Sequence, residues 1–121
     1  MRSSYGFFII SVSLHLKQYK TIIGMAESGI DFVKYDRLLN RLKVISHPDR
    51  MAIIEFLQNK DKASVTEILS NLNLVRNLTS IHLKLLRDQH LVISKRSAHK
   101  IYYSINHAVL SELINSINRC V

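Results

Sequence analysis

Apolar residues recur at helical spacing in several stretches of the chain, with polar turn residues between them. In the first stretch they fall at i, i+3, i+4, i+7 and i+10, the stripe of an amphipathic helix, and they are Tyr35, Leu38, Leu39, Leu42 and Ile45. Pro48 ends this helix, because the residue before a proline is pushed out of the helical region and proline fits the first turn of a new helix. The apolar residues that follow Pro48 lie on most sides of this second helix, so we expect it to be the most buried one.

Two further helices and a tight turn are predicted next. Ser64 and Glu67 have the spacing of a capping box, so a short third helix is expected from there to about Leu72. Asn73 follows it, and asparagine tolerates the left-handed conformation that a tight turn between helices requires. A fourth helix is expected over residues 76–89. Its inward positions, at i, i+4 and i+7, are Thr79, Leu83 and Leu86.

A β-hairpin and a last helix complete the pattern. The two strands are expected at residues 91–96 and 100–105, with residues 97–99 at the tip, because the second run alternates apolar and polar side chains. A fifth helix is expected from His107 to about Cys120. Its apolar stripe comprises Leu110, Leu113, Ile114, Ile117 and Val121.

The composition is that of one folded domain with a strong basic excess. The chain has 121 residues, 47% of them hydrophobic and 21% charged, which fits a globular protein with a single core. Its net charge is +8, and five of these eight charges lie within residues 76–100, over the fourth helix and the hairpin. Such an excess favours a polyanionic partner, either nucleic acid or an acidic membrane surface.

Residues 1–30 stand apart as an N-terminal extension, and residues 31–121 are expected to form the domain. The apolar stretch from Phe7 to Leu14 is interrupted by serines, is too short to span a membrane and is followed by no signal-peptide cleavage pattern. Met25 is an alternative start of the protein chain, because the pattern of helices and strands that follows needs no residues upstream of it. Cys120 is the single cysteine, so no internal disulfide framework forms, and we expect a cytoplasmic location with no membrane partner.

The order of these elements is that of a winged helix-turn-helix, which has two short helices joined by a tight turn and then a basic hairpin. The expected fold class is therefore mainly α, with about five helices and a two-stranded β-hairpin as the wing. In this arrangement the second helix of the pair presents short polar side chains to base edges in the major groove, and the hairpin reaches the phosphate backbone. The positive charge gathers on these same two elements.

Four segments in order carry a family resemblance. They are Leu42 to Met51 (LKVISHPDRM), Ser64 to Leu69 (SVTEIL), His82 to Val92 (HLKLLRDQHLV) and Ile101 to Ile105 (IYYSI). Together they resemble the ArsR/SmtB family of bacterial winged-helix repressors, over residues 35–118. The resemblance implies a homodimer, formed by the first and last helices, that binds an inverted-repeat operator in double-stranded DNA and is released by a signal.

The resemblance places the DNA contacts on the fourth helix and the wing. The matching positions are Arg76, Asn77, Ser80, Ile81 and Lys84 on the helix, and Lys95, Arg96, His99 and Lys100 on the wing. Arg76 is expected to pair with guanine, Asn77 with adenine and Ile81 with a thymine methyl group. The alternative is that these are solvated residues of an ordinary helix and a charged hairpin. The wing also lacks the glycine that the family usually has at its tip.

The dimer interface is expected on apolar residues of the first and last helices, namely Leu38, Leu110, Leu113, Ile114 and Ile117. No metal or cofactor is expected. Metal-sensing members often carry a Cys-x-Cys pair on the third helix, where this chain has Ser64 and Thr66, and hydroxyls are poor ligands for soft metals.

The histidines and the cysteine do not point to a site within one chain. The six histidines show no spacing that would cluster three of them. His82 is expected to pack near the turn, and His107 to be a capping or surface residue. A site assembled across the dimer stays open, as does a disulfide between two Cys120 thiols, which requires Cα atoms within about 7 Å.

Three other classes of function compete with a DNA-binding regulator. An enzyme is disfavoured, because all three glycines precede residue 30 and no nucleophile has an identifiable base beside it. A winged-helix protein-interaction module that does not read DNA would use the fifth helix and the Ile81 face to dock a partner. Membrane association through residues 5–14 is the third alternative. The charge on the fourth helix and the wing favours DNA, because phosphates must be neutralised there.

Overall fold

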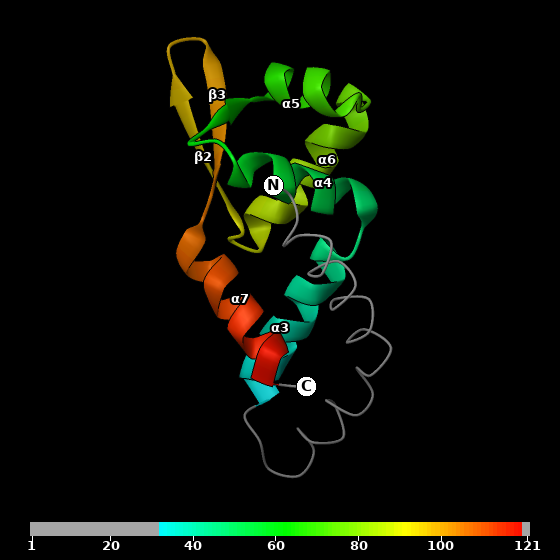
Figure 1. The fold of residues 1–121 in the computed structure, drawn as a ribbon, viewed down its shortest axis with the longest axis vertical. Coiled ribbons are helices and arrows are strands. Elements are labelled where there is room, and N and C mark those ends of the chain that lie inside the picture. The colour runs from blue at the N-terminus through cyan, green and yellow to red at the C-terminus, as the bar shows by residue number, and fades with distance from the viewer. Residues whose placement is uncertain (1–31, 120–121) are drawn as a thin grey trace.

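The computed structural model describes residues 32–119, and the expectations for residues 1–31, Cys120 and Val121 lie outside this range. In chain order its elements are α3 (Phe32–Ile45), α4 (Pro48–Gln58), β1 (Ala63–Ser64), α5 (Val65–Leu72), α6 (Arg76–Asp88), β2 (Val92–Ser97), β3 (Lys100–Ile105) and α7 (His107–Arg119) (Figure 1). The expected succession of helices and hairpin is confirmed. No helix within this range is long and apolar enough to cross a membrane.

The sheet has three strands, whereas the sequence predicted a two-stranded hairpin. β1 pairs with the edge of β3, with Ala63 opposite Tyr103 and Ser64 opposite Tyr102. A strand of two residues is too short to show alternation, so the sequence pattern does not reveal it. The pairing follows from helix capping, because Ser64 is the N-cap of α5 and an N-cap residue has extended dihedrals, here φ −79° and ψ 164°.

The turn of the hairpin is one residue shorter than expected. Pairing continues to Ser97 and Lys100, so only Ala98 and His99 form the tip, in place of residues 97–99. Ala98 has φ 56°, a left-handed conformation that glycine adopts at lower cost. The tip thus forms without the glycine usual there, at the cost of strain at one alanine.

The core lies between the helices and the base of the hairpin. α4 has more buried hydrophobic residues than any other described helix, as expected, and they are Met51, Ile53, Ile54 and Leu57. Val92, Tyr103 and Ile105 bury the base of the hairpin, whereas residues 95–101 at its end are exposed. Figure 1 shows the hairpin projecting at one end of the domain, and α3 packed beside α7 at the other. The core therefore anchors the wing and leaves its charged end in solvent.

Two local features at the ends of α5 position α6. Ser64 Oγ accepts from the N–H of Glu67 at 3.3 Å, and Glu67 Oε1 accepts from the N–H of Ser64 at 3.0 Å, so the expected capping box is confirmed. The hydrogen bond from the Ser64 backbone holds the pKa of Glu67 below its usual value. At the other end of α5, Asn73 has φ 53° and ψ 48°, the left-handed conformation expected of it. This residue turns the chain into α6.

Replacing Asn73 with alanine is expected to lower the free energy of unfolding by about 1 kcal/mol, because alanine adopts the left-handed conformation at a cost. Asn73→Gly should leave that free energy unchanged or raise it, since glycine adopts φ 53° freely. The measurement is urea unfolding at one fixed protein concentration.

Asn77→Ala is the matched control, because it makes the same side-chain change at an exposed helical position of α6. It should shift the free energy of unfolding by less than about 0.5 kcal/mol. Equal losses for the two alanine variants would show that the conformation of Asn73 is not what stabilises the turn.

Candidate nucleic-acid interface

The helix α6 buries one side and presents the other to solvent. Its buried positions include the three expected inward residues, Thr79, Leu83 and Leu86. Thr79 Oγ1 donates to the carbonyl of Val75 at 2.8 Å, so this buried hydroxyl is satisfied. All the residues of this helix that were expected to contact DNA are exposed, namely Arg76, Asn77, Ser80, Ile81 and Lys84. Their contacts with DNA stay a prediction.

The N-terminus of α6 is positive and has no acidic neighbour in its first turn. Val75 is the N-cap residue and makes no side-chain cap hydrogen bond. The N–H groups without a helical partner and the helix dipole attract anions to this end, and Arg76 adds a full charge. Within residues 32–119, Arg76 has no ion-pair partner. A phosphate group here would meet positive charge that nothing described compensates.

Lys84 differs from the other cations of this face because it is already paired. Its Nζ lies 3.0 Å from Asp88 Oδ2, one helical turn further along α6. The side chain of Lys84 is 65% exposed and that of Asp88 is 49% exposed. Water therefore weakens the pair, and a phosphate can compete for the lysine. Asp88 still lowers the local charge, so we expect Lys84 to contribute less to phosphate binding than an unpaired cation would.

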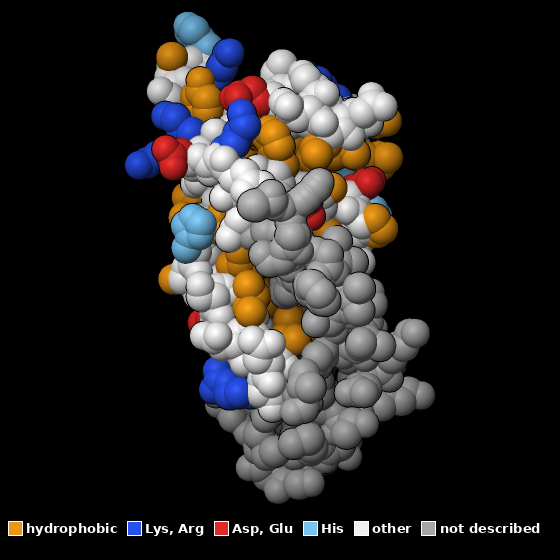
Figure 2. All heavy atoms as spheres, in the orientation of Figure 1, with side chains coloured by type: hydrophobic (Ala, Val, Ile, Leu, Met, Phe, Trp, Pro, Cys, Tyr) orange, Lys and Arg blue, Asp and Glu red, His pale blue; other side chains and the backbone are white. Residues whose placement is uncertain are grey.

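The wing carries cations on both of its faces. Arg96 lies opposite Ile101 and shares the face that is buried at the base of the hairpin, whereas Lys95 and Lys100 lie on the other face. In the part of the chain that the structure describes, none of these three cations forms an ion pair. Figure 2 shows Lys and Arg side chains gathered over the hairpin. His99 is exposed at the tip.

Lys62 belongs to the same cationic surface, although the sequence did not predict it. Its Nζ lies 4.9 Å from the centroid of the Tyr102 ring, a cation–π contact. Lys95 lies directly opposite Tyr102 in the sheet, so the two cations lie near one aromatic side chain. Lys62 is far from the hairpin in sequence and reaches it only through the pairing of β1 with β3, which no local pattern reveals.

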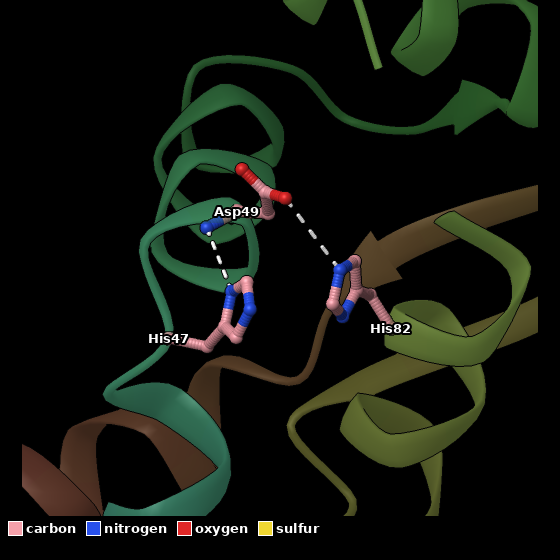
Figure 3. Close-up of side chains that lie close together, drawn as sticks. All are labelled: His47, Asp49 and His82. Atoms are coloured by element: carbon pink, nitrogen blue, oxygen red, sulfur yellow. Dashed lines mark hydrogen bonds and ion pairs between the residues drawn. The ribbon is translucent and has the colours of Figure 1, made fainter. Parts of the chain in front are cut away.

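A polar cluster joins α6 to the start of α4. Figure 3 shows His47, Asp49 and His82 converging between these helices. The ring centroids of His47 and His82 are 4.6 Å apart, and His82 Nε2 lies 3.6 Å from Asp49 Oδ2. His82 is buried, as expected for a residue packed near the turn. Spacing along the sequence could not find this cluster, because His82 lies on a different helix from the other two and meets them only through packing.

The ligand atoms of these three side chains lie within 4.8 Å of one another, close enough to surround a cation. Their hydrogen bonds favour another use. His47 Nδ1 accepts from the N–H of Asp49, and His82 Nδ1 accepts from Arg50 Nε, both at 3.1 Å. A neutral imidazole that accepts at Nδ1 carries its proton at Nε2, so neither ring offers a free lone pair, and the guanidinium of Arg50 repels a cation. We interpret the cluster as a structural network.

Arg50 connects this network to a third helix. Its Nη1 donates to the carbonyl of Val44 in α3 at 2.9 Å, while its Nε donates to His82 in α6. Burial lowers the pKa of His82 below its ordinary value of 6.5, and electrostatic interaction with His47 and Arg50 lowers this pKa further, against the opposite effect of Asp49. His82 is therefore neutral at pH 7, which is the form that accepts from Arg50.

The residues expected at the dimer interface fall into two groups. Leu110, Leu113 and Ile117 are buried within the single chain, where α3 packs against α7. Leu38 and Ile114 are half-buried at the edge of the core. A partner chain would therefore meet Leu38 and Ile114 first, and the composition of the interface stays a prediction.

These features define a class of protein, a winged helix-turn-helix domain in which α5 and α6 form the helix pair and β2 and β3 form the wing.

No protein-family model matches the chain. The arsenical resistance operon repressor of Staphylococcus aureus is 28% identical over 86 residues, which are 71% of this chain and 82% of that protein. The HTH-type transcriptional regulator YgaV of Escherichia coli (strain K12) is 34% identical over 76 residues, 63% of this chain and 77% of that protein.

A solved structure agrees with these relatives. The crystal structure of the transcriptional repressor PagR of Bacillus anthracis matches with a TM-score of 0.61 and 28% sequence identity, over 69% of this chain and 95% of that chain. The chain therefore belongs to the ArsR family of winged-helix transcriptional regulators, which confirms the resemblance of its four segments. These relatives are regulators of transcription and not enzymes, and this chain is a DNA-binding regulator of the same kind.

Acidification is expected to weaken the fold through His82. Because the pKa of His82 is lower in the folded chain than its ordinary value, the unfolded chain binds more protons in the interval between the two values. The stability that neutral His82 contributes is complete above pH 6.5 and is lost as the pH falls through the lowered folded pKa. The measurement is the free energy of unfolding at about pH 7.5 and about pH 5.5.

Two variants separate His82 from the other histidines. His82→Asn keeps an acceptor for Arg50 but cannot titrate in this range, so its loss on acidification should be smaller than that of the wild type. His99→Asn makes the same change at the exposed tip of the wing and should lose as much as the wild type. Equal losses in all three proteins would mean that His82 does not carry the pH dependence.

Proposed function

We propose that the chain is a homodimeric repressor that binds an inverted-repeat operator in double-stranded DNA, in the cytoplasm and without a resident cofactor. In this proposal α6 enters the major groove and the wing follows the phosphate backbone beside it. The observation that supports it most directly is the exposed charge on these two elements, because Arg76, Lys95, Arg96 and Lys100 have no ion-pair partner among the described residues.

The first two turns of α6 supply the base contacts. The guanidinium of Arg76 presents a fork of donors that matches guanine, and the amide of Asn77 matches the donor and acceptor of adenine. The hydroxyl of Ser80 can bond to more than one base. All three side chains are exposed near the start of the helix, where residues of a recognition helix reach base edges.

The wing and Lys84 supply the phosphate contacts. These contacts position the protein on the duplex and carry no sequence information themselves. They come from both faces and the tip of the hairpin, namely from Lys95, Arg96, His99 and Lys100.

An inverted repeat requires a protein with two-fold symmetry. α3 and α7 lie at the opposite end of the domain from the tip of the hairpin (Figure 1), so a partner that docks against Leu38 and Ile114 leaves the outer side of α6 free. The two recognition helices would then lie about one DNA turn apart, about 34 Å.

Arg96→Ala is expected to weaken binding to every duplex alike and to reduce the slope of log affinity against log salt by about 0.9, the value for one phosphate contact. Asn77→Ala should instead reduce the preference for the operator over scrambled DNA by about 5- to 100-fold and change the salt slope less. The measurement is fluorescence anisotropy across a salt series, on the DNA upstream of the protein's own gene and on a scrambled duplex.

Arg119→Ala is the control for charge, since it removes an exposed arginine at the end of α7. This variant should alter neither the slope of log affinity against log salt nor the preference for the operator over scrambled DNA. Identical behaviour of Arg96→Ala and Asn77→Ala would mean that the division into positioning and reading residues is wrong. Equal binding of the wild type to both duplexes would favour the protein-interaction module.

Ile114→Glu is expected to weaken the dimer at least about tenfold, because it places an unpaired charge in an apolar interface. Asn115→Glu adds the same charge at the next, exposed position of α7 and should leave the dimer intact. The measurement is size-exclusion chromatography with light scattering over a series of concentrations. A dimer of unchanged strength in Ile114→Glu would place the interface elsewhere.

A further inference from the structure

An apolar row crosses the exposed surface at the start of α6. Val75, Leu78 and Ile81 are spaced three residues apart, so each is a neighbour of the next along the surface. Their side chains are 63%, 53% and 54% exposed. Six large hydrophobic residues are exposed in the described part of the chain, and half of them form this row. Figure 2 shows hydrophobic side chains in a band beneath α5, at the level that α6 occupies in Figure 1.

Folding does not account for this row. A serine, threonine, asparagine or aspartate at the N-cap position would stabilise α6, yet the chain has Val75 there without a side-chain cap hydrogen bond. Leu78 and Ile81 leave more than half of their surface outside the core. Residues that disagree with the local requirements of folding are expected where a ligand is bound.

The surroundings of the row indicate the chemistry of that ligand. Arg76 and Asn77 lie between Val75 and Leu78 in the chain, and Ser80 and Lys84 are exposed further along the same helix. An apolar protein surface would leave these polar groups without partners, whereas a DNA groove offers acceptors, phosphates and apolar groups together. In the major groove the apolar group is the C5-methyl of thymine.

We propose that Val75, Leu78 and Ile81 form a thymine-reading row, which recognises half-sites by contact with thymine methyl groups in the major groove. The proposal rests on the proposed function and adds to it a second kind of base readout beside the hydrogen bonds of Arg76 and Asn77. It extends the expected contact of Ile81 to two residues that the sequence did not single out. The preferred half-site then has thymines next to the bases that Arg76 and Asn77 read.

Deoxyuridine tests the proposal, because it differs from thymidine only by the missing methyl group and keeps the same pairing edge. The preferred duplex is first selected from a randomised pool with the full-length protein. It is then synthesised once with thymine and once with deoxyuridine throughout both half-sites. For the wild type we expect the uracil duplex to bind about three- to fivefold more weakly for each methyl group contacted, as burial of one such group predicts.

Matched variants connect this loss to the row. Leu78→Ala and Ile81→Ala shorten exposed side chains of a helix in which alanine is well tolerated, so both variants should fold. In the double variant, which carries both substitutions, the dissociation constant for the uracil duplex divided by that for the thymine duplex should approach one. Ile93→Ala removes an exposed isoleucine from the wing instead and should keep the ratio of the wild type.

The outcomes distinguish the row from the proposed function. A wild-type ratio of one on a duplex that the protein still prefers over scrambled DNA would overturn the thymine-reading row and leave the repressor proposal intact. A ratio that stays unchanged in the double variant would overturn the row as well, because the methyl groups would then act through the shape of the DNA. A chain that selects no sequence at all would overturn both proposals and favour an apolar protein partner.

Discussion

Burial of the inner side of α6 is the constraint on which the whole candidate interface depends. Thr79, Leu83 and Leu86 are fully enclosed, so the helix has one permitted rotation about its axis. A rotation by one residue, about 100°, would drive Ser80 and Lys84 into the core. The same packing also sets the start of the wing, because the N–H of Leu91 donates to the carbonyl of Leu86 at 3.0 Å. The recognition helix and the wing therefore take their relative positions from one core.

The network around His82 makes this packing specific. An aliphatic side chain at that position would fill space, but it would leave Arg50 Nε without its acceptor. Because Arg50 also donates to the carbonyl of Val44, one guanidinium holds the end of α3 and the inner side of α6 in a fixed relation. Hydrogen bonds require a particular geometry, whereas apolar contacts tolerate sliding. The buried polar group thus specifies the register between helices that the apolar core stabilises.

Features that depend on neighbours in sequence were predictable, and features that depend on distant contacts were not. The capping box of Ser64, the left-handed turn at Asn73 and the inward positions of α6 follow from local chemistry and from helical period. The strand β1, the contact of Lys62 with Tyr102 and the cluster around His82 arise between segments far apart in the chain.

Periodicity also identifies an apolar face without saying what covers it. The stripe of α7 was expected at a dimer interface, and in the single chain Leu113 and its buried neighbours already pack into the core, so their part in an interface stays a prediction. The period of a helix reports that one side avoids water, and a partner chain and the rest of the same chain satisfy that requirement equally well. In the single chain α3 packs beside α7 and leaves Leu38 and Ile114 at the edge of the core.

The mixture of charge and apolar surface on α6 has a consequence for how affinity and specificity respond to salt. In the proposed complex, contacts of Arg96 and the other wing cations with phosphates would release counterions, so their contribution would fall as the salt concentration rises. The proposed contacts of Leu78 and Ile81 with methyl groups would release no counterions, and salt would not screen them. If the two kinds of contact act together, added salt lowers the affinity for all DNA while the preference between sequences persists. The unpaired cations then bring the protein to DNA, and the short polar and apolar side chains of α6 decide where on the DNA it stays.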